Sequence, residues 1–152
     1  MIKIITIGKI KETYLKEAID DYLKRINKYH KVEIIELKES KTNDINKDLS
    51  NEATNISKYI KDKDYIIICD KEGNKLSTEE LSVELNKTFN NLTNDLIFII
   101  GSSHGIDQEL KNKADYSISF SNLTFPHQLF RVILLEQLYR VFKVLNNESY
   151  HK

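Results

Sequence analysis

The sequence predicts a single α/β domain with a mostly parallel sheet and helices on both faces of that sheet. Short apolar runs alternate with longer segments of helical periodicity along the whole chain. The runs are apolar at nearly every position, which is typical of parallel strands that are buried on both faces. A chain of 152 residues is long enough for one hydrophobic core, and it contains no linker or internal repeat. We therefore expect residues 1–152 to form one domain.

Five apolar runs are predicted strands, at residues 2–7, 32–37, 65–69, 96–100 and 116–120. The third is expected to end in a turn at 70–74. Glycines and serines follow the fourth at 101–105, and a small polar loop follows the fifth at 121–126. Because ligands bind at the carboxyl ends of strands in α/β sheets, we expect the fourth and fifth strands to form a binding crevice.

Helical periodicity predicts helices that begin near Lys11, Ile45, Ser77 and Pro126, and a short helix that begins at Ile106–Asp107. Ser77 and Glu80 have the spacing of a capping box, and proline suits the first turn of a helix. Residues 38–48 are polar and form the expected mobile loop.

The last predicted helix is apolar almost all round. Its polar residues form one narrow stripe, which consists of Glu136, Arg140, Lys143 and Asn147. A helix that only covers a sheet needs one apolar face. We therefore expect one side to pack on its own core and the other on a second copy, as in a symmetric homodimer.

Composition excludes several classes of protein. Lys and Arg together number 23 and Asp and Glu also number 23, which argues against a protein that coats nucleic acid indiscriminately but allows a local basic patch. No apolar run is long enough to cross a membrane, and the single cysteine fits a reducing cytoplasm. We therefore expect no membrane partner. His104 and His127 have no further Cys, His or Asp at the spacing of metal ligands, so we also expect no metal.

Several features have both a functional and a purely structural interpretation. The 101–105 turn matches neither the dinucleotide fingerprint nor a P-loop; it could hold a ligand, or only connect strand to helix through positive backbone dihedrals. The loop from Phe120 to Phe125 would suit a flat heterocycle, and equally an ordinary surface loop. Arg131 interrupts an apolar surface near His127, and it needs either a ligand or a salt-bridge partner.

Two further positions also allow two interpretations. Cys69 ends a buried strand and is better explained as a packed small side chain than as a nucleophile. The terminal Tyr150-His151-Lys152 could be a frayed end, or a tail placed across a neighbouring site.

The chain resembles one family over its whole length. The shared motifs are Ile4-Ile5-Thr6-Ile7-Gly8-Lys9, Asp70-x-x-Gly73-x-x-Leu76-Ser77, Ile100-Gly101-x-x-x-Gly105, Ser119-Phe120-Ser121-x-Leu123-Thr124-Phe125-Pro126-His127-Gln128-x-x-Arg131-Val132, Glu136-Gln137-x-Tyr139-Arg140-x-x-Lys143 and the last three residues. They resemble the small SPOUT-class methyltransferases that modify N3 of a pseudouridine in large-subunit ribosomal RNA.

The resemblance implies a C-terminal trefoil knot, an obligate homodimer and S-adenosylmethionine as the methyl donor. By position, the cofactor would lie against Cys69, Gly101, Phe120, Ser121, Asn122, Leu123, Thr124 and Phe125. The candidates for deprotonating the target base or stabilising its anion are His127, Arg131, Arg140, Tyr150 and His151. The implied substrate is 23S ribosomal RNA, in the large subunit or in the assembled 70S ribosome.

One departure and two alternatives accompany this hypothesis. Relatives usually have Gly-Gly where this chain has Gly101-Ser102, and a serine fits that turn only with unstrained dihedrals. A SPOUT methyltransferase could act on transfer RNA instead, because a fold does not determine a substrate. A dimeric RNA-binding module without catalysis is the alternative from another class.

Overall fold

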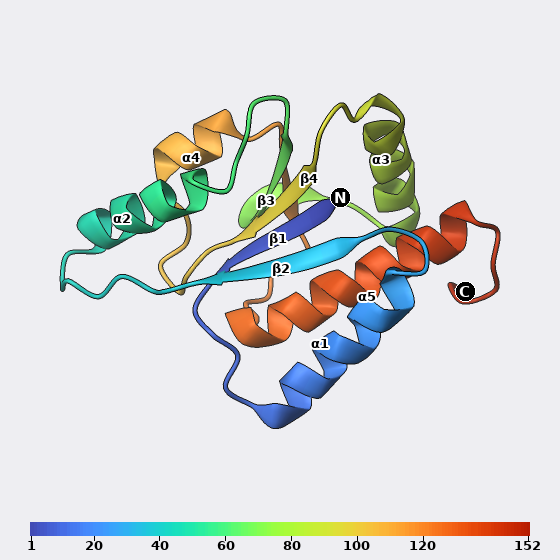
Figure 1. The fold of residues 1–152 in the computed structure, drawn as a ribbon, viewed down its shortest axis with the longest axis horizontal. Coiled ribbons are helices and arrows are strands. Elements are labelled where there is room, and N and C mark those ends of the chain that lie inside the picture. Colours follow the sequence, from blue (N-terminus) through green and yellow to red (C-terminus); the bar gives the residue numbers. More distant parts are fainter.

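A computed structural model describes all residues from Met1 to Lys152 as three layers, with a sheet between two layers of helices (Figure 1). The strands are β1 (Ile2–Ile7), β2 (Val32–Leu37), β3 (Tyr65–Lys75), β4 (Leu96–Ile100) and β5 (Tyr116–Ser119). The helices are α1 (Thr13–Ile26), α2 (Ile45–Ser57), α3 (Thr78–Asn91), α4 (Gln108–Lys113) and α5 (His127–Leu145). The predicted alternation of strands and helices is confirmed.

The sheet has five parallel strands in the order β2-β1-β4-β3-β5. Side chains alternate between its faces, so Ile2 and Ile4 belong to one apolar cluster while Ile5 and Ile7 belong to another. The central strand β4 is buried along its whole length. This double-sided burial explains why the strand sequences are continuously apolar.

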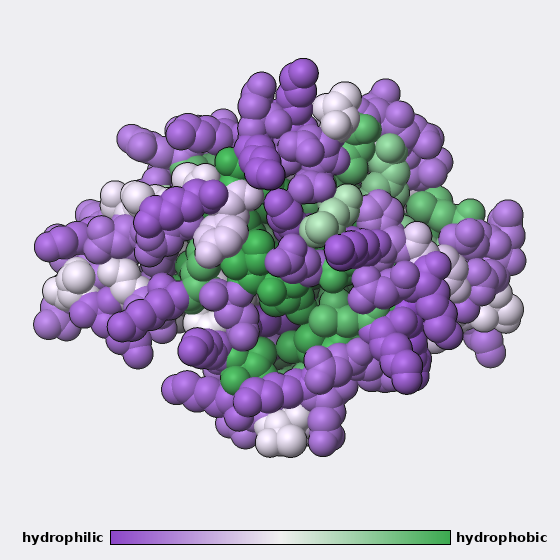
Figure 2. Space-filling view, viewed as in Figure 1, coloured by the Kyte–Doolittle hydropathy of each residue, from purple (hydrophilic) through white to green (hydrophobic).

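The two clusters define the two helical layers. The larger cluster joins the sheet to α1, α3 and α5, and the smaller one joins it to α2 and α4. In Figure 1, α1 and α5 lie side by side on one side of the sheet, with α2 and α4 on the other. Figure 2 shows apolar surface mainly in the middle of this view, within a polar border. No helix has the length and hydropathy needed to span a bilayer.

β3 is longer than the sequence indicated, and the turn expected at 70–74 is wrong. The strand continues to Lys75, because Asn74 and Lys75 pair with β5 after an irregularity in the register. Gly73 permits this close approach, since a Cβ there would lie 2.7 Å from the backbone of Ile118. The amide of Asn74 also donates to the carbonyl of Ser117.

The polar segment before α2 is shorter than expected and is anchored. The helix begins at Ile45 with Asp44 as its N-cap, so Asp48 is helical and not part of a loop. The buried Asp48 carboxylate accepts hydrogen bonds from the hydroxyl of Ser40 and from both the amide and the hydroxyl of Thr42. These bonds hold residues 38–44 against α2 and keep the pKa of Asp48 below its usual value.

The predicted helix termini are confirmed in two cases. Ser77 and Glu80 form both hydrogen bonds of a capping box at the start of α3. Pro126 is the N-cap of α5, one residue before the helix begins.

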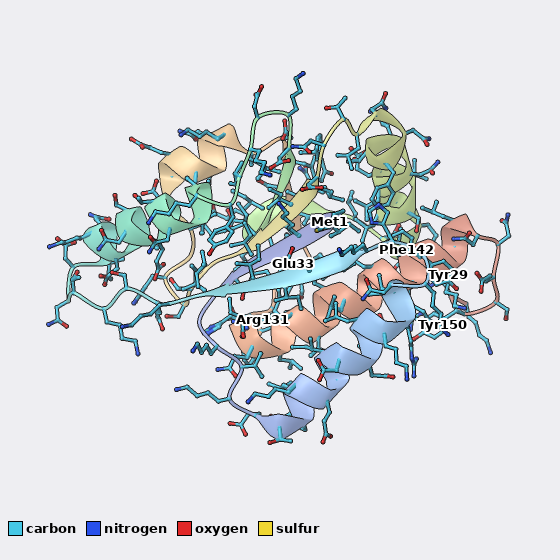
Figure 3. All side chains as sticks on the ribbon, viewed as in Figure 1. Met1, Tyr29, Glu33, Arg131, Phe142 and Tyr150 are labelled. Carbon is cyan, nitrogen blue, oxygen red and sulfur yellow. The ribbon has the colours of Figure 1, made fainter.

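Arg131 is the largest fully buried side chain in the protein, with 1% of its surface exposed. Its guanidinium donates to the carbonyl oxygens of Ile7 and Gly8 at 3.2 and 2.8 Å, and to Glu36 Oε2 at 2.7 Å. Burial lowers its pKa, and the Glu36 carboxylate opposes that shift. Arg131 therefore joins the start of α5 to the ends of β1 and β2 (Figure 3).

We predict that Arg131→Met lowers the free energy of unfolding by about 3–5 kcal/mol, because it leaves buried carbonyl groups and a carboxylate without their donor. Urea denaturation at fixed protein concentration would measure this loss. Arg25→Met is the matched control: its ion pair with Asp21 is exposed, so a change within about 1 kcal/mol is expected. Equal stability of Arg131→Met and the parent would contradict the structural role of this cation.

Candidate functional site

A cavity of about 550 Å³ opens at the carboxyl ends of β4 and β5, beside residues 69–71 in the middle of β3. Its size is within the range of small-molecule sites. Its walls combine apolar side chains with small polar ones: Cys69, Asp70, Lys71, Ile100, Gly101, Ser102, Ser103, Gly105, Ile106, Ile118, Ser119, Phe120, Ser121, Leu123, Thr124, Phe125, Pro126, His127 and Phe130. The expected crevice is present, but β4 and β5 are not neighbours, because β3 lies between them.

Cys69 lines the pocket from β3, where it is paired with Ile100 of β4 and Ile118 of β5. Burial, with a smaller effect of the neighbouring Asp70 carboxylate, raises the pKa of its thiol to about 12. The thiol is therefore neutral near pH 7 and contributes an apolar wall, as expected for a packed side chain and not a nucleophile.

The loop after β5 forms one side of the pocket through its aromatic residues. Phe120 packs edge-on against Phe130 with ring centroids 5.0 Å apart, and Phe125 stacks near the same ring. The hydroxyl of Ser121 accepts a hydrogen bond from the amide of Leu123 at 2.9 Å, which tightens the turn. Of the predicted cofactor residues on this loop, Asn122 alone does not line the cavity.

The turn after β4 requires glycine at position 101 for a reason that the sequence did not indicate. Gly101 does not have a positive φ, whereas Gly105 does, at 93°. A Cβ on Gly101 would lie 2.3 Å from the carbonyl oxygen of Gly105 and 2.5 Å from Ile106 Cγ1. A side chain here would therefore collide with the turn itself before it reached the cavity.

Ser102, the departure from the family pattern, has an unstrained backbone and a buried partner. Its φ is not positive, and its hydroxyl donates to Glu52 Oε1 at 3.0 Å. The other Glu52 oxygen accepts the amide of Ser40, also at 3.0 Å. The Glu52 carboxylate, on α2, therefore joins the 38–44 segment to the pocket turn.

Sequence reasoning missed Glu52. The available signal was its position, because it shares the apolar face of α2 with Leu49, Ala53 and Ile56 at helical spacing. A carboxylate on such a face requires hydrogen-bond donors.

His127 is the one predicted catalytic candidate that lines the cavity. It is half-buried at the start of α5, and its ring makes no hydrogen bond within the protein. A Cβ on Gly8 would lie 3.8 Å from His127 Nε2, so the end of β1 closely approaches the ring. Arg131, one turn further along, points instead into the contacts with β1 and Glu36 described above.

The other three candidates form a second cluster at the far end of α5. Arg140 pairs with Glu136 at 2.8 Å, and its guanidinium lies 4.9 Å from the centre of the Tyr150 ring. Tyr150 donates to Glu136 at 3.1 Å. Arg140 is roughly 20 Å from His127 along the helix, at 1.5 Å per residue. Figure 3 shows Arg131 and Tyr150 near opposite ends of α5.

Two neighbours restrict the hydrogen-bonding roles of the two ring nitrogens of His151. Nδ1 lies 3.3 Å from Arg140 Nη1, which can only donate, so Nδ1 must be the acceptor. Nε2 lies 2.6 Å from Glu79 Oε1 and therefore carries the proton. In this arrangement the ring has no free lone pair. The hydrogen bond from His151 also lowers the pKa of Glu79.

No group of three or more His, Cys, Asp or Glu side chains is arranged to hold a metal ion.

The fold is a single-domain α/β fold with a five-stranded parallel sheet, and it has a counterpart among solved structures. The structure of a probable methylase family protein from Haemophilus influenzae superposes with a TM-score of 0.54 at 15% identity, over 96% of this chain and 66% of that one. This likeness establishes the fold alone.

The sequence comparisons define the family. The model described as "Predicted SPOUT methyltransferase" matches residues 1–151, and the chain belongs to this family. The protein called ribosomal RNA large subunit methyltransferase H in Caldicellulosiruptor bescii is 48% identical over the whole of both chains. Its counterpart in Acetivibrio thermocellus is 46% identical over 99% of both chains.

We predict that Ser102→Ala loosens the pocket turn, because it leaves a buried Glu52 oxygen without a donor. The amide of Gly105, which donates to the carbonyl of Ser102 at 2.9 Å, should exchange hydrogen roughly tenfold faster, as expected for about 1.4 kcal/mol. Ser50→Ala, an exposed change on α2, should leave this rate at the parental value. Unchanged exchange in Ser102→Ala would show that Glu52 does not support the turn.

Proposed function

We propose that this protein transfers a methyl group from S-adenosylmethionine to N3 of a pseudouridine in 23S ribosomal RNA. The observation that carries the proposal is full-length identity of 46–48% to proteins called ribosomal RNA large subunit methyltransferase H. Such identity over whole chains, with a pocket at the expected strand ends, extends the family assignment to a substrate class. A cytoplasmic location would place the protein with ribosomes.

The residues that line the pocket support S-adenosylmethionine as its proposed occupant. Ile100, Ile118 and Phe130 provide apolar walls for an adenine ring, and the Phe120–Phe125 loop offers hydroxyl and backbone groups to the polar parts. The neutral Cys69 thiol adds an apolar contact and does not compete as a nucleophile. When bound, S-adenosylmethionine supplies a methyl group on a sulfonium sulfur that already acts as a leaving group.

The protein must position the base and assist loss of the N3 proton. His127 is the best candidate for accepting it, because its ring lines the pocket and makes no hydrogen bond within the protein. His151 could accept a proton only after release from Arg140. Arg140 suits stabilisation of the deprotonated base, or contact with phosphate. Arg131 supports the pocket through its contacts with the end of β1.

We further propose a homodimer that pairs the open faces of two α5 helices. Leu129 is 38% exposed, and Val132, Ile133, Glu136 and Arg140 continue the same face at helical spacing. If a two-fold axis crosses antiparallel helices near Ile133, Arg140 of the partner subunit comes close to His127. The dimer would then unite the two groups of candidates, which are roughly 20 Å apart in one chain.

The C-terminal tail, residues 150–152, has a role in the proposed dimer. In the single chain, Tyr150 and His151 pack on α5 and contact Glu79 at the start of α3. In the dimer, this tail would serve the pocket of the partner, where its aromatic ring could stack on a base. The trefoil knot implied by the family resemblance stays a prediction.

Two alternatives give different results in simple assays. A methyltransferase acting on transfer RNA would modify purified transfer RNA and leave ribosomes unmodified. A non-catalytic RNA-binding module would not bind S-adenosylmethionine in calorimetry. Mass spectrometry of RNA from large subunits and 70S ribosomes treated with the protein would identify the methylated nucleotide and the preferred particle. Absence of methylation in both particles would overturn the proposal.

We predict that deletion of Tyr150–Lys152 reduces methylation of ribosomal particles by an order of magnitude or more, the scale expected for loss of a positioned catalytic group. The dimer and the affinity for S-adenosylmethionine should be preserved, because the pocket and the core of α5 remain. Sedimentation and calorimetry are the controls. Parental methylation by the truncated protein would assign the tail no role in the reaction.

A further inference from the structure

The segment that follows β1 is clamped along its backbone. The amide of Gly8 donates to the carbonyl of Leu37 at 2.6 Å, and the carbonyl of Gly8 accepts from Arg131 at 2.8 Å. The amide of Ile10 donates to Glu36 Oε2 at 2.9 Å, the same oxygen that accepts from Arg131. We call residues 8–11 the Gly8–Lys11 arch. Its path is determined by side chains from β2 and α5.

The arch presents two cations to solvent. Ile10 is buried in the larger apolar cluster, while Lys9 and Lys11 on either side of it are exposed. Neither lysine is part of an ion pair. The nearest acid in the chain, Glu12, is exposed and also has no ion-pair partner. Two unpaired positive charges are therefore held on a constrained backbone.

The arch contacts the first turn of α5, which carries a pocket-lining residue. The amide of Lys11 donates to the side chain of Gln128, at 3.3 Å, in the first turn of α5. The adjacent residue of that turn is His127, which lines the pocket and closely approaches Gly8. Lys9 and Lys11 therefore belong to a segment that contacts the pocket-lining first turn of α5.

A buried arginine and its carboxylate partner are weak evidence for stability by themselves, because desolvation offsets much of their attraction. Here the same pair holds the backbone of an exposed segment.

The net charge of the whole chain is zero, so attraction of a polyanion must come from cations concentrated in one place. Lysine ammonium groups fit phosphate oxygens as point charges.

We propose that the Gly8–Lys11 arch is an RNA-backbone contact, in which Lys9 and Lys11 bind phosphates of the strand whose base enters the pocket. This inference rests on the proposed function, since it takes RNA as the occupant. The contacts position the strand without reading its sequence. Loss of the lysines should therefore weaken RNA binding and leave the chemistry of a bound base unchanged.

The test compares the double variant Lys9→Gln/Lys11→Gln with Lys16→Gln. Lys16 is an exposed, unpaired lysine on α1 and serves as the control for loss of surface charge. For the double variant, we expect KM for large subunits to rise about tenfold at low salt, while kcat and affinity for S-adenosylmethionine stay at parental values. The slope of log Kd for a 23S ribosomal RNA fragment against log salt should fall by about 2, or about 1 for each phosphate contact. Lys16→Gln should match the parent in all four measurements.

Three outcomes would overturn the inference: a parental KM and salt slope in the double variant, a fall in kcat alone, or an equal effect of Lys16→Gln. Failure of the proposed function has a different signature, because the parent itself would then neither bind S-adenosylmethionine nor methylate ribosomal particles. The salt slope for the RNA fragment tests the arch even in that case.

Discussion

The guanidinium of Arg131 donates to the carbonyl oxygens at the end of β1 and to the carboxylate of Glu36 at the end of β2. The same Glu36 oxygen holds the segment that follows β1. Through these contacts α5 is fastened to the carboxyl edge of the sheet, where parallel strands place their binding loops. The position of His127 at the pocket, one turn before Arg131, follows from this attachment. Arg131, which the family resemblance suggested as a catalytic candidate, therefore has a structural role within its own chain.

α5 has a different role at each end. Its first turn faces the pocket, its middle contributes Leu134, Leu135 and Leu138 to the core, and its last turns carry Arg140 beside the C-terminal tail. The separation between the two ends exceeds the reach of any side chain. In the dimer proposed above, a second copy paired along the same helix would bring the two ends together and cover apolar surface.

The Glu52–Ser102 contact gives a partner to the serine that the family resemblance marks as a departure from Gly-Gly. A glycine at position 102 would have no hydroxyl to donate to this carboxylate, so the pocket turn and α2 would lose this bond. Glu52 also accepts from the amide of Ser40, and it therefore links the pocket turn to the segment that precedes α2.

The sequence by itself determined the elements of this protein and their class. Continuous apolar runs, helical periodicity and the Ser77–Glu80 capping box depend on residues close together in the chain, and they predicted five buried strands and the helices between them. The tertiary structure decided which elements became neighbours. The insertion of β3 between β4 and β5, the pairing of Arg131 with Glu36 across 95 positions and the bond between Ser102 and Glu52 across 50 are contacts between distant segments. Local periodicity carries no information about such partners, because they are selected by the packing of the whole chain.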